Sequence, residues 1–169
     1  AMCLPSSGLS LEDKQEVNRL LLASGLDIRT MNAVRRRMSA IKGGQLAAAA
    51  APARVVTLAI SDIPGDDLAA IASGPTAVDD TARMDLSVIA GCLGPALPEP
   101  AARLLCAPGR SVEIRNADPI RVIASAADAL SAAAEVAAAH GVTPVVLGDD
   151  IEGEARLVAE DMASKVLAL

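Results

Sequence analysis

A chain of 169 residues is long enough to bury one hydrophobic core, which predicts a single α/β domain over residues 1–169. The sequence contains no Phe, Tyr or Trp and carries a formal net charge of −6, which argues against a nucleic-acid binder. The longest apolar run is interrupted by Pro52 and Arg54, so no membrane span is predicted, and free, dispersed cysteines indicate a reducing compartment such as the cytoplasm.

Apolar spacing and turn residues predict the following elements in chain order: helices over 11–24, 31–41 and 45–51, a strand over 55–63, helices over 85–94 and 98–109, a strand over 120–125, a helix over 126–140, a strand over 143–150 and a helix over 152–169. Ser10 with Asp13 and Ser125 with Asp128 have the spacing of capping boxes, and Thr30 can cap the second helix. His140 is expected to cap the end of its helix.

The strand, helix and strand of residues 120–150 have the short joints of a parallel, right-handed βαβ unit. Residues 55–63 form a continuous apolar run, which is typical of a central strand covered on both faces. The sequence therefore predicts a layered, Rossmann-like α/β domain, with a mostly parallel sheet of at least three strands flanked by helices. In such folds ligands bind beyond the carboxyl ends of the strands.

The first candidate site is the basic segment 32–46. Polar and basic side chains recur there at helical spacing, namely Asn32, Arg35 or Arg36, and Ser39. Lys42 follows one turn later, and the amides of Gly43 and Gly44 are expected to be free to approach a ligand. Charged donors and free amides suit an anionic substrate, whereas the alternative is a solvated basic helix with a glycine cap.

The second candidate site is the end of the strand over 55–63. Ser61, Asp62 and Asp66 surround a turn formed by Pro64 and Gly65, and carboxylates in such a place can ligate Mg²⁺ or act as a general base. Residues 73–76, Ser-Gly-Pro-Thr, could add hydroxyl and amide donors. The alternative is that Asp66 or Asp67 caps a helix beginning at Leu68, although this leaves Ser61 and Asp62 unexplained.

The remaining sequence patterns say less about function. Residues 148–155, GDDIEGEA, place Glu154 and Ala155 where a phosphate-binding loop has Lys and Ser or Thr, so they are interpreted as a helix cap. No G-x-G-x-x-G fingerprint follows any predicted strand, and no G-x-S-x-G elbow is present.

The segments NAVRRRMSAIKGGQLA and ISDIPGDDLAAIASGPT, in this order, resemble the glycerate 2-kinase family, whose members often carry the name hydroxypyruvate reductase. The flanking segments LPSSGLSLEDKQEVNRLLLASG and TPVVLGDDIEGEAR extend the resemblance over nearly all of the chain. Arg36 and Arg37 stand where the family pattern has Lys and His, and residues 77–117 match it poorly.

The resemblance implies Mg²⁺-dependent transfer of a phosphoryl group from ATP to D-glycerate, giving 2-phosphoglycerate. It implies Lys42, Asp62 and Asp66 as catalytic residues, with Mg²⁺ at Asp62 and Asp66. It implies that substrate and phosphate are bound by Asn32, Arg35, Ser39, Gly43, Gly44, Ser61, Ser73, Gly74 and Thr76.

The same resemblance implies that catalysis needs parts that this chain does not contain: a preceding glycine-rich loop, an N-terminal lysine and a C-terminal domain. We therefore expect a fragment of a larger two-domain enzyme, inactive by itself. The resemblance suggests a homodimer, and the free cysteines indicate a cytoplasmic location. A nicotinamide-dependent hydroxypyruvate reductase and a non-catalytic assembly module are the alternatives.

Overall fold

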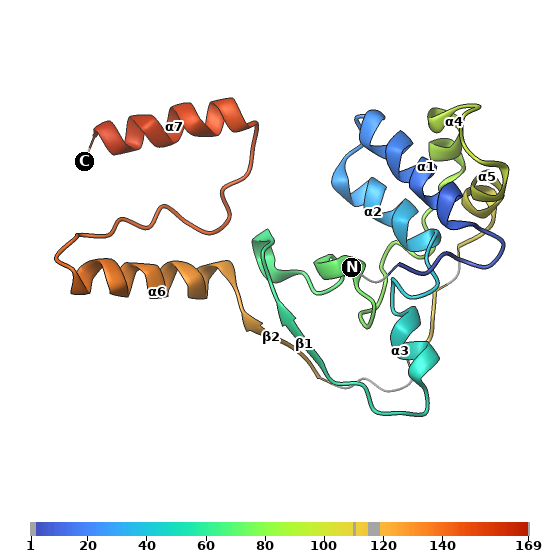
Figure 1. Cartoon of the computed structure of the whole chain (residues 1–169), viewed down its shortest axis with the longest axis horizontal. Coiled ribbons are helices and arrows are strands. Elements are labelled where there is room, and N and C mark those ends of the chain that lie inside the picture. Colours follow the sequence, from blue (N-terminus) through green and yellow to red (C-terminus); the bar gives the residue numbers. More distant parts are fainter. Residues whose placement is uncertain (1–2, 110, 115–118, 169) are drawn as a thin grey trace. The chain divides into compact units, whose positions relative to one another are not determined.

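The computed structural model describes residues 3–109, 111–114 and 119–168 of the chain. Within it the chain forms two compact units (Figure 1). Unit 1 comprises Ala1–Leu58 with Leu68–Arg121, and unit 2 comprises Ala59–Asp67 with Val122–Leu169. The single domain over 1–169 stays a prediction.

The sheet confirms the α/β class but is smaller than the sequence predicts. Strands β1 (Thr57–Ile60) and β2 (Ile120–Ala124) pair in parallel, and the amide of Ser61 extends the pairing by donating to the carbonyl of Ala124 at 2.9 Å. The third strand, predicted over 143–150, is wrong, since the structure gives these residues no strand. An apolar run becomes a strand only where a neighbouring strand pairs with its backbone N–H and C=O groups. The apolar pattern of a sequence does not show whether such a neighbour is present.

Strand β1 is also shorter and less buried than predicted. It spans four residues, and the side chains of Leu58 and Ile60 are 62% and 69% exposed. The prediction that both faces are covered is therefore wrong for this strand within the described chain.

Helix α1 (Leu11–Ala23) begins at the predicted capping box, in which Ser10 and Asp13 each accept a hydrogen bond from the other's amide. Helix α2 (Ile28–Arg37) is capped by Asp27 rather than by Thr30, because the Asp27 carboxylate accepts from both the amide and the hydroxyl of Thr30. The predicted extension of this helix to residue 41 is wrong. Arg37 ends it, and Ser39 instead forms an antiparallel bridge with Pro5.

Unit 1 also contains helices α3 (Gln45–Ala50), α4 (Ser87–Leu93) and α5 (Glu99–Cys106) and the short 3₁₀ turn η2 (Ile71–Ser73). The 3₁₀ turn η1 (Pro64–Asp66) belongs to unit 2. The core of unit 1 is aliphatic, as a chain without aromatic residues requires, and includes Val17, Leu21, Val34, Met38, Leu86, Ala101 and Leu105. These residues come from α1, α2, α5 and the approach to α4, so the core holds the ends of α1 and α2 in place for the site described below.

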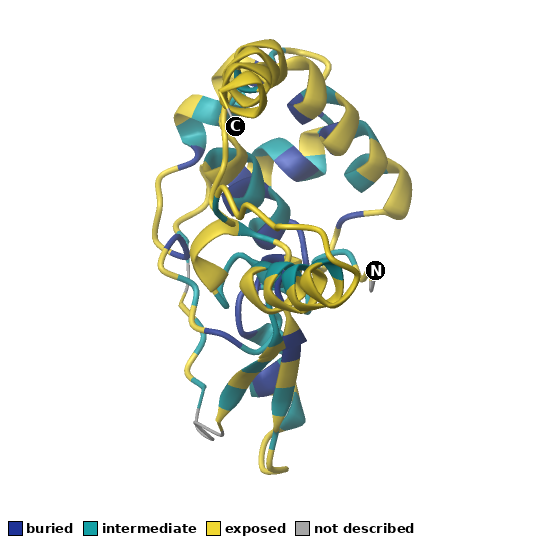
Figure 2. Ribbon diagram, turned by 90° about the vertical axis from the view of Figure 1, so that its left-hand side faces the viewer, coloured by how far each residue is buried: buried dark blue, intermediate teal, exposed yellow. Residues whose placement is uncertain are grey.

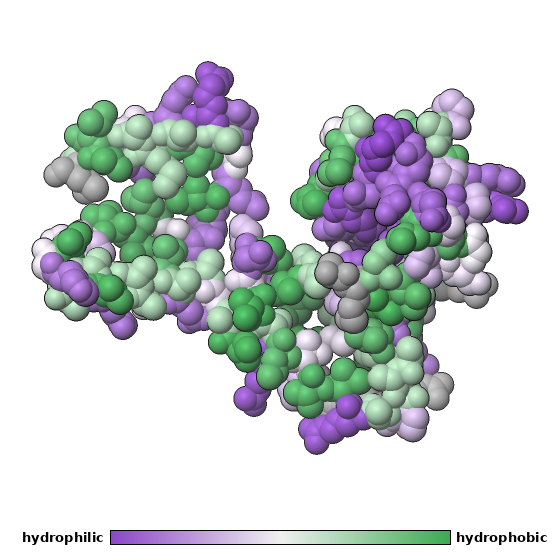
Figure 3. All heavy atoms as spheres, viewed as in Figure 1, coloured by the Kyte–Doolittle hydropathy of each residue, from purple (hydrophilic) through white to green (hydrophobic). Residues whose placement is uncertain are grey.

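Unit 2 contains α6 (Ala126–Ala139) and α7 (Ala155–Leu167). The predicted Ser125–Asp128 capping box, the His140 cap and the Glu154 cap are all present, and Leu169 lies outside the described residues. Both helices are mostly exposed (Figure 2), and apolar side chains gather on their facing sides (Figure 3). Among the described residues, no helix is long and apolar enough to cross a membrane.

Candidate functional site: a basic loop joined to a strained turn

The loop that follows α2 is shaped by a fully buried serine. The Ser39 hydroxyl accepts hydrogen bonds from the amides of Ile41 and Lys42, both at 3.3 Å, and donates to the carbonyl of Leu4 at 3.4 Å. Ser39 was predicted to bind substrate. The structure gives its hydroxyl three bonds inside the protein, so the residue fixes the backbone from which Lys42 projects.

Two motifs that lie thirty residues apart in the sequence are joined directly in unit 1. We name them the basic loop (Lys42–Gly44) and the serine turn (Ser73–Thr76). The amides of Gly43 and Gly44 donate to the carbonyls of Ser73 and Gly74 at 3.1 and 2.8 Å. The Lys42 Nζ donates to the carbonyl of Ala72 at 3.0 Å, which ties the charged side chain to the same segment. The expectation that the two glycine amides are free for a ligand is therefore wrong, because both are used to hold the serine turn.

The double glycine is needed for this close approach. Both residues adopt left-handed backbone conformations, with φ of +61° at Gly43 and +80° at Gly44. A Cβ on Gly43 would lie 2.9 Å from Oδ2 of Asp79, and one on Gly44 would lie 3.0 Å from the carbonyl of Ala77. Side chains at either position would push the basic loop away from the segment that follows the serine turn.

We therefore expect Gly43→Ala to lower the free energy of unfolding by about 2–3 kcal/mol. Gly25→Ala is the matched control, since Gly25 has a φ of +70° but nothing within 4 Å of a Cβ, so it isolates the backbone penalty of about 1 kcal/mol. Urea unfolding of both variants measures the difference. Equal losses at the two positions would contradict the close approach at Gly43.

The backbone is strained where the serine turn begins, at Ser73 and at Ala72 just before it. Ala72, Ser73 and Gly74 are all left-handed, with φ of +51°, +62° and +57°. Non-glycine residues in this region each cost about 1–2 kcal/mol, and such strain persists where surrounding contacts impose it. Here those contacts are the hydrogen bonds from the basic loop.

The hydroxyls of the serine turn differ in what they contact. Ser73 is buried, and its hydroxyl has no hydrogen bond to any part of the chain that the structure describes. The Thr76 hydroxyl lies 2.8 Å from that of Thr57. Ser73 is therefore the better of the two candidates for a ligand contact.

Arg35 lies close to the basic loop, with neutral partners only. Its Nε and Nη2 donate to Oδ1 of Asn18 at 3.1 and 2.9 Å, and its Nη1 donates to Oδ1 of Asn32 at 3.2 Å. Asn32 and Arg35 thus lie on one helix face, as predicted, and are joined by a hydrogen bond. Amide oxygens orient the guanidinium but leave its positive charge uncompensated, which suits an incoming anion.

The positive charge of Arg35 affects the ammonium of Lys42. Burial lowers the pKa of its ammonium from the ordinary lysine range, and repulsion from Lys14 and Arg35 lowers this pKa further. Lys14 was not predicted as a site residue. The sequence did hold a signal, because a lysine in the first turns of a helix faces the positive end of the helix dipole, where cations are disfavoured.

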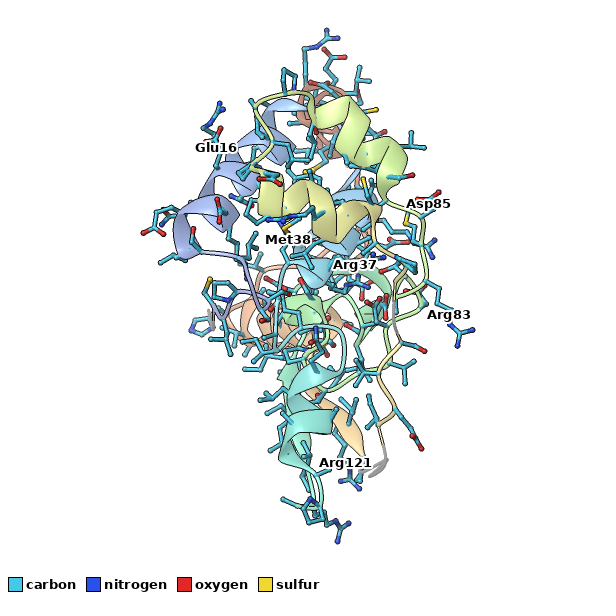
Figure 4. All side chains as sticks on the ribbon, turned by 90° about the vertical axis from the view of Figure 1, so that its right-hand side faces the viewer. Glu16, Arg37, Met38, Arg83, Asp85 and Arg121 are labelled. Atoms are coloured by element: carbon cyan, nitrogen blue, oxygen red, sulfur yellow. The ribbon has the colours of Figure 1, made fainter. Side chains whose placement is uncertain are left out.

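Arg36, the alternative to Arg35 in the sequence, has a structural role. It is buried, and its Nη1 lies 2.7 Å from Oδ1 of Asp79 and 3.2 Å from the Thr81 hydroxyl. Arg37 donates to four backbone carbonyls, those of Ala82, Met84, Leu104 and Ala107. Figure 4 shows Arg37 between α5 and the segment carrying Arg83 and Asp85. The two arginines thus hold residues 79–84 against α2 and α5.

A cavity of about 740 Å³ in unit 1 opens beside this arginine network. Its lining includes Ser6, Arg36, Gly43, Asp79 and Thr81. Gly43 is the one predicted site residue among its described lining residues. Arg36 pairs with Asp79 there, and Arg37, which also lines the cavity, donates to four backbone carbonyls.

The acidic residues that follow β1 belong to unit 2. Ser61 is buried, and its hydroxyl lies 3.4 Å from the carbonyl of Ile63. The predicted tight turn is confirmed as η1, with Gly65 and Asp66 in left-handed conformations (φ +74° and +51°). The alternative helix beginning at Leu68 is wrong, since turns and η2 occupy residues 68–73.

The carboxylates of Asp62 and Asp66 are exposed and have no hydrogen bond or ion pair with the described residues. No group of three or more His, Cys, Asp or Glu side chains within the described ranges could hold a metal ion. Magnesium usually takes one or two carboxylates, with water and substrate phosphates completing its shell. Two unpaired carboxylates fit that donor set but do not form a closed protein site for a metal.

Comparisons with known proteins place the chain in a family. The model of a domain of unknown function, DUF4147, matches residues 1–106. An Agrobacterium vitis protein named "Putative hydroxypyruvate reductase" is 53% identical over 154 residues, which are 90% of this chain and 40% of that protein. A "Glycerate kinase" of Danio rerio is 37% identical over 166 residues, which are 92% of this chain and 33% of the relative.

A comparison with solved structures also identifies a glycerate kinase. The crystal structure of glycerate kinase from Thermotoga maritima superposes with a TM-score of 0.68 at 32% sequence identity, covering 82% of this chain and 33% of that one. This chain thus spans about two fifths or less of the length of the relatives it matches.

Proposed function

The chain belongs to the DUF4147 family, and from this premise we infer that it contributes an anion-binding part to a glycerate 2-kinase. The proposed reaction transfers the terminal phosphoryl group of ATP to the 2-hydroxyl of D-glycerate and yields 2-phosphoglycerate. Because the chain spans a minority of its relatives' length, we propose that the whole enzyme carries the activity. A cytoplasmic location and a homodimer stay predictions.

One observation carries the proposal: the basic loop is bonded to the strained serine turn, beside an arginine whose charge is not neutralised. Phosphoryl transfer involves little covalent chemistry by the protein, so catalysis depends on positioning and on charge stabilisation. Lys42 and Arg35 supply positive charge on a backbone that Ser39, Gly43 and Gly44 hold in place.

The proposed roles follow from what each side chain has left to donate or accept. Lys42 and Arg35 bind the oxyanions of the substrate or of the transferring group. Ser73 donates its hydroxyl to a phosphate oxygen, and Gly74 permits the turn that presents it. Asn32 orients Arg35. Thr76 supports the turn through Thr57.

Asp62 and Asp66 are proposed to hold Mg²⁺ or to orient the glycerate hydroxyl. Their exposed, unpaired carboxylates are the hard oxygen ligands that this ion prefers. When bound, Mg²⁺ supplies positive charge that neutralises phosphate oxygens. The Ser61 hydroxyl already contacts the carbonyl of Ile63, and we assign this residue to the start of the acidic turn.

Two parallel assays on the full-length enzyme test the proposal. With ATP, Mg²⁺ and D-glycerate, a coupled assay is expected to record ADP release that depends on glycerate. With hydroxypyruvate and NADH or NADPH, absorbance at the nicotinamide band is expected to stay constant, because phosphoryl transfer consumes no nicotinamide cofactor. Loss of that absorbance without glycerate-dependent ADP release would instead support the reductase name carried by the Agrobacterium vitis relative.

A further inference from the structure

The ammonium of Lys14 is placed unusually in unit 1. Lysine side chains normally bury the stem and keep the charged end in water. Lys14 does the reverse: the residue is partly exposed, yet its Nζ is shielded from solvent and has no hydrogen-bond partner in the described chain. A shielded, unpaired charge is costly, so this arrangement calls for a partner that the protein itself does not provide.

The surroundings of Lys14 increase that cost. It lies in the first turns of α1, where the helix dipole is positive. It is also near enough to Lys42 for their charges to repel. Arg35 donates to Asn18, which follows Lys14 by one turn on α1, so its guanidinium lies beside the same face of this helix. Its charge also acts on Lys42.

None of these three cations forms an ion pair with a described residue. Arg35 contacts two asparagine oxygens and Lys42 contacts one carbonyl, all of them neutral. Other basic side chains of the chain do have carboxylate partners: Arg19, Arg29, Arg36, Arg103, Arg156 and Lys165. Carboxylate partners are thus common among the described basic side chains, although Arg37 also has none and donates to backbone carbonyls only.

We propose that Lys14, Arg35 and Lys42 form one anion site and that its ligand is a phosphate group. Three uncompensated cations favour a dianionic phosphate over a carboxylate, which carries a single charge. The Lys14 side chain, with four rotatable carbons, can turn its ammonium onto the ligand. The assignment deepens the proposed function and rests on it only for the source of the phosphate, either the nucleotide or the phosphorylated product.

Lys14→Met tests the proposal on the purified protein, with inorganic phosphate as the first probe. Methionine keeps an unbranched stem and removes the charge. Phosphate affinity measured by calorimetry is expected to fall at least about 10-fold, which is the loss of one charge-assisted hydrogen bond. Without phosphate, the melting temperature is expected to stay equal or to rise, because an unpaired buried charge has been removed.

Two further variants separate binding from folding. Lys14→Arg restores the charge and is expected to recover most of the phosphate affinity. Lys165→Met is the matched control, because its ammonium pairs with Asp161 at 2.7 Å on the exposed face of α7, and its phosphate affinity is expected to match the wild type. If Lys14→Met does not fold, phosphate protection of the wild-type Lys14 amine from acetylation, read by mass spectrometry, replaces it.

Titrations with ATP, 2-phosphoglycerate and D-glycerate identify the source. If Lys14→Met lowers the affinity for ATP alone, the bound phosphate belongs to the nucleotide. If it lowers the affinity for 2-phosphoglycerate alone, the bound phosphate belongs to the product. A loss for D-glycerate equal to that for 2-phosphoglycerate would overturn the phosphate assignment, and unchanged phosphate binding in Lys14→Met would overturn the site. These are binding measurements, so they stand even if the kinase assay fails.

Discussion

Lys42→Met in the full-length enzyme is expected to lower kcat/KM for D-glycerate by about 10²-fold or more. The Ala72 carbonyl holds the ammonium of the half-buried Lys42 in place, and removing one such preorganised donor commonly costs 10²- to 10³-fold in rate. Steady-state ADP release measures the effect.

Lys42 also bonds the Ala72 carbonyl, so a structural contribution must be separated from a chemical one. We expect Lys42→Met to melt within a few degrees of the wild type, because the glycine amides still hold the serine turn. Lys165→Met is the control and should keep wild-type kinetics. Retention of wild-type kcat/KM by Lys42→Met would remove the basic loop from the mechanism.

Asp62→Asn is expected to reduce kcat by about 10²- to 10⁴-fold, the range found when a positioned acid–base group or metal ligand is lost. Asparagine keeps the shape of the side chain and removes its charge. If Asp62 holds Mg²⁺, the variant needs more Mg²⁺ for half-maximal rate. If it orients the hydroxyl instead, the Mg²⁺ requirement stays unchanged while kcat falls.

Asp161→Asn makes the same substitution on α7, where the carboxylate pairs with an exposed lysine. It is expected to keep wild-type rates, because exposed ion pairs contribute little. Asp66→Asn, tested alongside, identifies which carboxylate carries the larger effect. A full rate in both Asp62→Asn and Asp66→Asn would exclude the acidic turn from catalysis.

The helices could be predicted because their signals are local. Capping boxes at Ser10 and Ser125 set the starts of α1 and α6, and glycine and proline set most ends. The prediction that Thr30 caps α2 was wrong. Asp27 lies three residues earlier, and its carboxylate is a better hydrogen-bond acceptor than the threonine hydroxyl. That competition is local too, so residues 27–30 are sufficient to predict it.

The basic loop and the serine turn were singled out as candidate motifs, but their direct connection could not be predicted. Hydrogen bonds between residues 42–44 and 72–74 depend on tertiary packing, which spacing along one helix does not encode. Three other features also depend on tertiary packing and could not be predicted: the burial of Ser39, the Arg36–Asp79 pair and the shielded ammonium of Lys14. The strand expected over 143–150 failed for the related reason that a strand is defined by its partner.

The identity of the reaction product tests the central claim most directly. Full-length enzyme is incubated with ATP, Mg²⁺ and D-glycerate, and the phosphorus spectrum of the products is recorded by NMR. The account predicts a phosphate monoester whose phosphorus couples to the single hydrogen on C2, as in 2-phosphoglycerate, formed in step with ADP. A product phosphorylated at C3, or ATP left intact while hydroxypyruvate is consumed with a nicotinamide cofactor, would contradict it.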